Sequence, residues 1–201
     1  GERIAKPDAL PAGVRSVDLD VLADSSGDVA AGVANILTNP GAAAAALGHG
    51  AAEALMKDSY RNIVSHPSAL AAYRAFFLDL IDDERTGGAL FHCTTGKDRT
   101  GWAAAVFLRA VGVSEDDVRA DYLQTNADLL PALAPMIEAV RAAGVDPELL
   151  MPVFGVRDEY LDAAVEEART RFGSLEGYVT DGLGLTAAHI DALRDRFVVA
   201  D

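Results

Sequence analysis

The segment that most constrains this chain is the run from Phe91 to Gly101, which reads F-H-C-T-T-G-K-D-R-T-G and holds the chain's single cysteine. A strand-like run, Gly88 to Phe91, precedes it, and an almost wholly apolar run, Trp102 to Val111, follows it. The first run is typical of a short buried strand, which we expect at Ala89 to His92, and the second of a core helix. The pattern therefore predicts a loop that leaves a strand and enters the N-terminus of a helix.

A loop of this kind is suited to hold a phosphate group. The first N–H groups of a helix have no intrahelical partners and lie at the positive end of the macrodipole. Gly96 lets the backbone curl without a Cβ, and the planar guanidinium of Arg99 suits two phosphate oxygens at once. The same positive field lowers the pKa of a thiol, so Cys93 is expected to be a thiolate that attacks phosphorus.

The other side chains of the loop suggest supporting roles. Asp98 is the nearest carboxylic acid that can protonate a leaving oxygen. Lys97 adds a mobile cation that can reach another phosphate on the substrate, Thr100 can hydrogen-bond the sulfur, and His92 can brace the loop. The substrate-binding residues expected in the loop are His92, Thr94, Thr95, Gly96, Lys97, Thr100 and Gly101.

The residue spacing excludes two other kinds of site, a nucleotide-hydrolase phosphate loop and a zinc site. The phosphate loop of nucleotide hydrolases needs a glycine where Phe91 stands and a hydroxyl where Asp98 follows Lys97. A zinc site lacks a second cysteine, and the four histidines are scattered. The bland alternative for Cys93 is a small buried apolar side chain. No metal or cofactor is expected.

The loop resembles the signature of the cysteine-dependent protein tyrosine phosphatase superfamily. Its H-C-x-x-G-K-D-R-T-G form is similar to the bacterial tyrosine and lipid phosphatase branch typified by mycobacterial protein tyrosine phosphatase B. The resemblance covers about Leu37 to Val199. Three further segments look like motifs of that branch: Ala120–Asn126, Gly155–Leu161 and Phe172–Tyr178.

The resemblance implies an α/β fold, with a parallel or mixed sheet flanked by helices. It implies one phosphatase domain over 1–201, a phosphate-binding loop at 92–101 and an alanine-rich helical lid at 28–66. Cys93 would be the nucleophile, Asp98 the general acid and Arg99 a phosphate ligand. The family's first segment, with an N-F-R-D-like motif and a D-L-R-S run, has no counterpart here, so the sheet is expected to be incomplete.

The implied activity is hydrolysis of phosphotyrosine, with phosphoserine and phosphothreonine as further substrates. Two alternatives stay open. The first is a phosphoinositide phosphatase for which tyrosine activity is incidental, and Lys97 favours it because this position resembles lipid-active members. The second is a phosphate-binding module without turnover, which the presence of Cys93, Asp98 and Arg99 disfavours.

The charge of the chain limits its partners. A net charge of −14 is the wrong sign for nucleic acid or an anionic membrane surface, so a phosphorylated protein or phosphoinositide must bind through local cations. No apolar run reaches the roughly 18 residues of a membrane span, so stable membrane insertion is not expected. The sequence opens without a visible signal peptide, which predicts a cytoplasmic location or secretion without such a leader.

The segment before the loop carries a second candidate carboxylate. Val14 to Leu22 alternates apolar and polar residues and predicts a strand. Asp24 follows in the turn, and in the resembled branch this turn borders the site. Asp24 is therefore a candidate for acid or positioning work, with a solvated turn aspartate as the alternative.

Alanine dominates the apolar residues of 28–66, and breaks at Asn39–Gly41 and Gly48–Gly50 divide it into short helices. Alanine buries little area, so weak packing predicts a mobile lid, with a surface helical pair as the alternative. Tyr60 and Arg61 near its end are candidates to face substrate, and core or surface roles are equal alternatives.

The remainder of the chain predicts helices and their caps. Ser114 and Asp146 are expected N-caps. Arg157 is a second candidate cation for the substrate, with a salt bridge as the alternative. The expected helices run over 67–83, 102–111, 114–125, 126–143 and 156–172, followed by two that open at Ser174 and Thr186.

Overall fold

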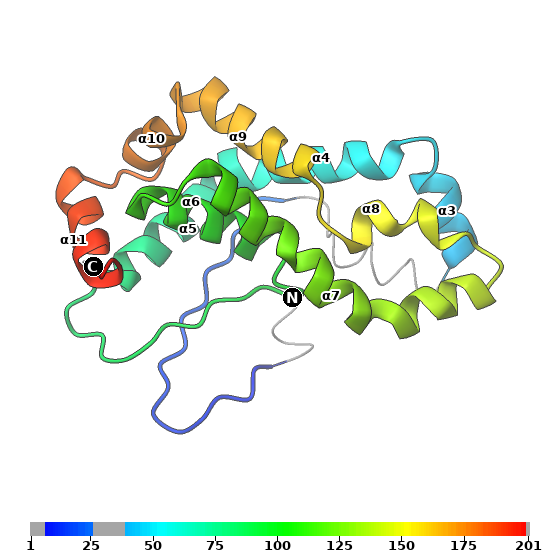
Figure 1. Ribbon diagram of the computed structural model, residues 1–201, viewed down its shortest axis with the longest axis horizontal. Coiled ribbons are helices and arrows are strands. Elements are labelled where there is room, and N and C mark those ends of the chain that lie inside the picture. The colour runs from blue at the N-terminus through cyan, green and yellow to red at the C-terminus, as the bar shows by residue number, and fades with distance from the viewer. Residues whose placement is uncertain (1–6, 26–38, 200–201) are drawn as a thin grey trace.

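The computed structural model describes residues 7–25 and 39–199 (Figure 1). Helices account for most of these residues, and the two segments outside the helical body are 7–25 and the stretch from Ile81 to Asp98. The elements are α3 (Pro40–Leu47), α4 (Ala51–Ser65), α5 (Pro67–Leu80), α6 (Arg99–Val111), α7 (Glu115–Ala142), a 3₁₀ turn (Pro147–Leu149), α8 (Met151–Phe154), α9 (Asp158–Phe172), α10 (Leu175–Gly177), a π turn (Tyr178–Gly182) and α11 (Ala187–Phe197).

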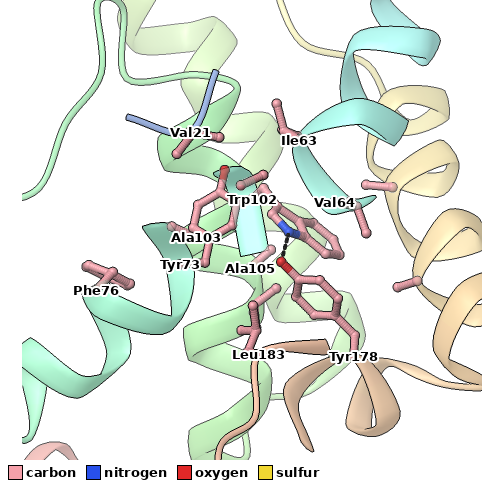
Figure 2. Packing of buried hydrophobic residues seen from close by; sticks show 14 of the residues in the cluster. Val21, Ile63, Val64, Tyr73, Phe76, Trp102, Ala103, Ala105, Tyr178 and Leu183 are labelled. Carbon is pink, nitrogen blue, oxygen red and sulfur yellow. Dashed lines mark hydrogen bonds between the residues drawn. The ribbon is translucent and has the colours of Figure 1, made fainter. Parts of the chain in front are cut away.

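The main core lies around Trp102 of α6. Its indole is 1% exposed, and its Nε1–H donates a hydrogen bond of 3.1 Å to the hydroxyl of Tyr178 (Figure 2). Residues of α4, α5, α7, α9 and α11 also belong to this cluster, and a smaller cluster joins α4 to the end of α7 and to α8. The helix that follows the Cys93 loop is therefore fixed in the middle of the core.

Helices α4 and α9 lie side by side (Figure 1). The expected apolar face of α4 at i, i+4 and i+7 is confirmed, since Met56, Tyr60 and Ile63 are all buried. Opposite them, α9 presents small residues, Ala164 and Ala168, which let the two helices approach closely. This part of the expected lid is thus a core element; residues 28–38 of that segment lie outside the described residues.

The predicted α/β fold was wrong: in the part of the chain that the structure describes, there is no strand and no sheet. Val14–Leu22 and Ala89–His92 were expected as strands. Val14 and Val17 are about half exposed, and Leu90 is 90% exposed. A strand needs a neighbour whose N–H and C=O groups complete its ladder, and neither segment has one among the described residues.

The apolar residues of the first segment that are buried pack singly against helices. Val21 is buried in the main core, and Leu19 and Leu22 pack on it. Backbone hydrogen bonds from Val14 to Pro11 and from Ser25 to Leu22 are turns within the segment. Only the end of this segment therefore contacts the core, and its alternation does not correspond to pairing in a sheet.

Helix α7 runs unbroken where two helices were predicted, and it contains Pro131 and Pro135. A proline in a helix removes one N–H donor and crowds the preceding turn. Both prolines are exposed, so water can satisfy the carbonyl groups that lose their partner.

The predicted caps are confirmed: Ser114 accepts from Asp117 N–H and Asp146 from Glu148 N–H.

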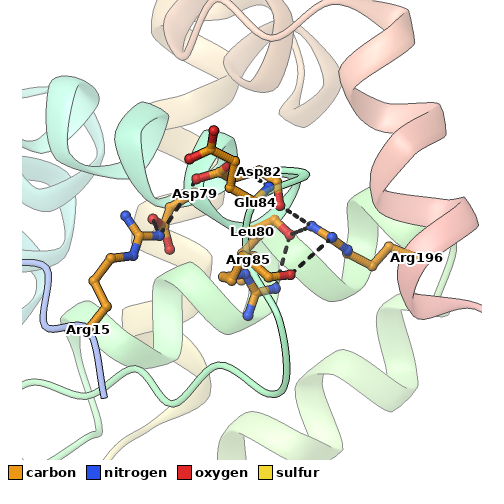
Figure 3. A network of polar contacts seen from close by, with 7 residues as sticks. All are labelled: Arg15, Asp79, Leu80, Asp82, Glu84, Arg85 and Arg196. Carbon is orange, nitrogen blue, oxygen red and sulfur yellow. Dashed lines mark hydrogen bonds and ion pairs between the residues drawn. The ribbon is translucent and has the colours of Figure 1, made fainter. Parts of the chain in front are cut away.

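Arginine side chains hydrogen-bond the backbone carbonyl groups at the C-terminal end of α5, before the segment that carries Cys93 (Figure 3). Arg196 of α11 donates to the carbonyls of Leu80 and Asp82, at 2.8 and 2.9 Å, and Arg85 also donates to Leu80, at 3.0 Å. Cationic side chains satisfy helix-end carbonyls and favour the negative end of the dipole. The start of the segment that carries the loop is thus tied to α5 and α11.

None of the helices described here is both long and apolar enough to cross a membrane.

Candidate active site

Residues 94–98 bend into the N-terminus of α6. Asp98 is the N-cap residue, and its carbonyl accepts the first helical hydrogen bond, from Trp102 N–H at 2.9 Å. Gly96 has φ of +75°, in the left-handed region that favours glycine. The glycine therefore lets the backbone curl just before the helix begins, as the sequence predicted.

The Cys93 thiol is partly buried and has a lowered pKa. Burial acts to raise this pKa, but the hydroxyl and backbone N–H of Thr100, the charge of Arg99 and the backbone N–H of Gly96 together outweigh it. These groups all favour the thiolate. The sulfur therefore lies among the donors that the loop was expected to supply.

Alkylation of Cys93 gives a direct check of this lowered pKa. Iodoacetamide reacts with the thiolate, so the midpoint of its rate against pH should lie below the ~8.5 of a free cysteine. Replacing Thr100 by valine removes one donor to the sulfur and should move the midpoint upward. Because Cys93 is the only cysteine, the labelling is unambiguous. A midpoint at or above the free value in the wild-type chain would contradict the assignment.

Arg99 bridges the two ends of the loop. Its Nη2 donates a hydrogen bond of 3.2 Å to Thr94 Oγ1, and its carbonyl accepts one of 3.1 Å from the hydroxyl of Tyr73. Tyr73 comes from α5 and is buried. The guanidinium is thus placed across the loop while α5 fixes its backbone.

Asp98 accepts two hydrogen bonds on the same oxygen. Lys97 Nζ donates to Oδ1 at 2.8 Å, and the Tyr60 hydroxyl donates to it at 2.9 Å. Lys97 is 5% exposed and is the one buried charged residue among those described. The lysine that the sequence offered as a mobile cation therefore has its ammonium on the neighbouring carboxylate.

The remaining predicted residues have these positions. His92 Nδ1 lies 2.9 Å from the Cys93 carbonyl oxygen and Nε2 lies 3.5 Å from Asp8 Oδ1, so both ring nitrogens contact the chain around the loop. Asp24 accepts from Ser68 N–H at 2.6 Å, in the first turn of α5. The structure brings the residues of 92–101 together, whereas Asp24 caps a neighbouring helix.

The candidates from the helical segments also have defined partners. Arg157 pairs with Glu53 at 3.0 Å, which favours the salt-bridge alternative over a substrate contact. Arg61 pairs with Asp58 on the surface of α4. Tyr60, by contrast, is fully buried and contacts Asp98.

Contacts between the recognised motifs support the loop, and sequence reasoning missed them. The Tyr122 ring lies 3.3 Å from the position that a Cβ on Gly101 would occupy, so the ring packs closely against this glycine. Asn126 exchanges hydrogen bonds of 2.8 and 2.9 Å with the backbone of Val156. Tyr178 accepts the hydrogen bond from Trp102. The only sequence signal for these contacts was that all belong to the segments quoted above.

Comparison with known proteins shows that this chain is similar to phosphatases. A family model described as "Tyrosine phosphatase family" matches residues 1–199. A protein of Cupriavidus necator, provisionally named a tyrosine-protein phosphatase, is 36% identical over 119 residues, which are 59% of this chain and 44% of that protein. The triple specificity protein phosphatase PtpB of Mycobacterium tuberculosis is 35% identical over 156 residues, 72% of this chain and 55% of that protein.

The chain spans about half the length of the curated relatives that it matches. The family match nevertheless runs along nearly all of its residues and includes the loop around Cys93. On that match, the chain belongs to the tyrosine phosphatase family.

Proposed function

We propose that this chain is a cysteine-dependent phosphomonoester hydrolase. Its substrates are phosphotyrosine and, beside it, phosphoserine and phosphothreonine. The observation that carries the proposal is the lowered pKa of Cys93 in a loop closed by Arg99 at the start of α6. The names of the two relatives, a tyrosine-protein phosphatase and a triple specificity protein phosphatase, support the substrate class.

The first step transfers the phosphoryl group to the enzyme. The Cys93 thiolate forms a bond to phosphorus as the bond from phosphorus to the ester oxygen breaks. Asp98, the carboxyl group next to the loop backbone, gives its proton to the leaving oxygen. Arg99 and the backbone N–H groups of the loop stabilise the charge on the three equatorial oxygens.

The second step releases phosphate. The Asp98 carboxylate takes a proton from water, the water oxygen bonds to phosphorus, and the bond from sulfur to phosphorus breaks. The Thr100 hydroxyl, which hydrogen-bonds Cys93, stabilises the thiolate as it leaves. No step needs a metal ion.

The same proposal assigns the other parts of the chain. Residues 1–201 form one phosphatase domain, with the phosphate-binding loop at 92–101. The substrate-binding positions are His92, Thr94, Thr95, Gly96, Lys97, Thr100 and Gly101. The segment 28–66 is the helical insertion of this proposal, and of its described residues those of α4 pack in the core and are not part of a moving lid.

Release of inorganic phosphate from a substrate panel tests the proposal. The panel contains a phosphotyrosine peptide, phosphoserine and phosphothreonine peptides, and a series of phosphoinositides. The fastest turnover is expected on phosphotyrosine. Faster turnover on phosphoinositides would favour the lipid alternative, and tight peptide binding without any phosphate release would favour a binding module.

Replacing Asp98 by asparagine should slow poor leaving groups most. Phenoxide needs a proton, whereas 4-nitrophenoxide leaves readily without one. We therefore expect kcat/KM, which reports only the first step, to fall ~10²-fold for phenyl phosphate, and only a few-fold for 4-nitrophenyl phosphate, on loss of a general acid. The exposed Asp58, on the surface of α4, gives a matched control, since Asp58→Asn should change neither rate. Equal slowing of both substrates by Asp98→Asn would remove Asp98 from the acid role.

A further inference from the structure

A buried chain of hydroxyl groups leads from two helices to Asp98. Tyr122 of α7 donates a hydrogen bond of 2.7 Å to the hydroxyl of Tyr60, and Tyr60 of α4 donates one of 2.9 Å to Asp98 Oδ1. Tyr60 is 0% and Tyr122 is 3% exposed. Neither tyrosine belongs to the phosphate loop, and the steps proposed above use neither.

The direction of this chain follows from its chemistry. Burial, followed by the negative charge of Asp98, raises the pKa of Tyr60 well above its ordinary value. Burial also raises the pKa of Tyr122. Each phenol is therefore neutral at working pH and has one proton to donate. A carboxylate can only accept, so Tyr60 donates to Asp98 and must accept from Tyr122.

The Tyr60 ring is held firmly in place. It lies edge-on to the Tyr122 ring, with ring centroids 6.3 Å apart, and packs against the Tyr160 ring at 5.7 Å. Lys97, the other donor to Asp98, is also buried, but it is the adjacent residue of the loop and does not belong to another helix. Tyr60 is therefore the donor that ties the carboxylate to the rigid helical core.

We propose that Tyr60, itself oriented by Tyr122, positions Asp98 for proton transfer in the proposed hydrolysis. The inference rests on the proposed function and adds a positioning pair to it. Two donors on Oδ1 make that oxygen the poorer base, so the acidic proton resides on Oδ2. The proton passed to the leaving oxygen is that of Asp98, and Tyr60 keeps its own throughout.

Tyr60→Phe removes the donor and keeps the ring. If Tyr60 positions the acid, kcat/KM for phenyl phosphate, which reports only the first step, should fall about tenfold, a part of the roughly 10²–10⁴ that a general acid contributes. The value for 4-nitrophenyl phosphate should change less than about twofold, because that leaving group does not need the acid. The affinity for inorganic phosphate should be unchanged, since Tyr60 does not touch the phosphate-binding groups.

A double-mutant comparison makes the test specific. In an Asp98→Asn background, Tyr60→Phe should slow phenyl phosphate and 4-nitrophenyl phosphate by the same factor, because the acid that Tyr60 positions is already absent. Tyr160→Phe is the matched control. It also loses a buried hydroxyl next to Tyr60, but that hydroxyl donates to the Pro152 carbonyl at 3.0 Å. It should affect the two substrates equally.

Tyr122→Phe is the second variant, for use if Tyr60→Phe unfolds. Its effect should have the same leaving-group dependence and be smaller, since it acts through Tyr60. Equal slowing of both substrates by these variants, or leaving-group dependence that persists without Asp98, would overturn the inference and leave the hydrolysis standing. A wild-type chain that releases no phosphate from either ester would overturn the proposed function, and the inference with it.

Discussion

Replacing Cys93 by serine should lower phosphate release from a phosphotyrosine peptide by ~10⁴-fold or more, as loss of a nucleophile does in other covalent enzymes. The loop makes a thiolate from a thiol because Thr100, Arg99 and Gly96 stabilise the negative sulfur. A serine hydroxyl starts from a far higher pKa, so the same donors leave it protonated and weakly nucleophilic.

Binding should survive this change. The phosphate ligands proposed for the loop are backbone N–H groups and Arg99, and serine alters neither. Phosphate release is measured with the malachite green reaction, and binding with a fluorescent phosphotyrosine peptide. A serine variant with wild-type turnover would end the cysteine mechanism. A variant that loses binding and turnover together would show that the loop itself had changed shape.

The sequence predicted the loop well because its rules are local. The positive φ at Gly96, the entry of the loop into a helix and the pKa shift of Cys93 all depend on residues of the short segment 93–102. The same holds for the caps at Ser114 and Asp146. Such features need no knowledge of how distant segments meet.

The contacts that hold Asp98 could not be predicted in the same way. Tyr60 lies 38 residues before Asp98 and 62 before Tyr122 in the chain. The apolar spacing of α4 predicts that Tyr60 is buried, but not which polar atom faces its hydroxyl. For that reason the sequence left core and substrate-facing roles for Tyr60 equally open.

The predicted sheet was wrong because strand formation also depends on residues far away in the chain. Alternation in Val14–Leu22 and the short apolar run at Ala89–His92 both fit a strand, but pairing depends on a partner. Helices α4, α5, α6 and α9 supply the core that a sheet was expected to supply. The family resemblance inferred from the motifs was right, since the family model matches this chain. The α/β fold that it implied was wrong for the described residues.

A second large effect is expected from Gly177→Ala, at the turn that presents Tyr178 to Trp102. The φ of Gly177 is −61°, which any residue adopts, so its backbone angle is not the constraint. A Cβ at this position would lie 2.0 Å from the carbonyl oxygen of Phe172. The conflict is with backbone, so no change of rotamer relieves it, and the turn must move.

Movement of this turn would pull Tyr178 away from Trp102, whose indole fills the core behind the phosphate loop. The free energy of unfolding should therefore fall by ~3 kcal/mol or more, the range reached when a core contact is broken. For a chain of this size that corresponds to a drop in Tm of roughly 10 °C. Gly88→Ala is the matched control, because a Cβ there meets nothing within 4 Å, and its Tm should stay at the wild-type value. Equal Tm values for the two variants would mean that the turn at Gly177 adapts freely, and that Tyr178 does not fix the helix on which the loop depends.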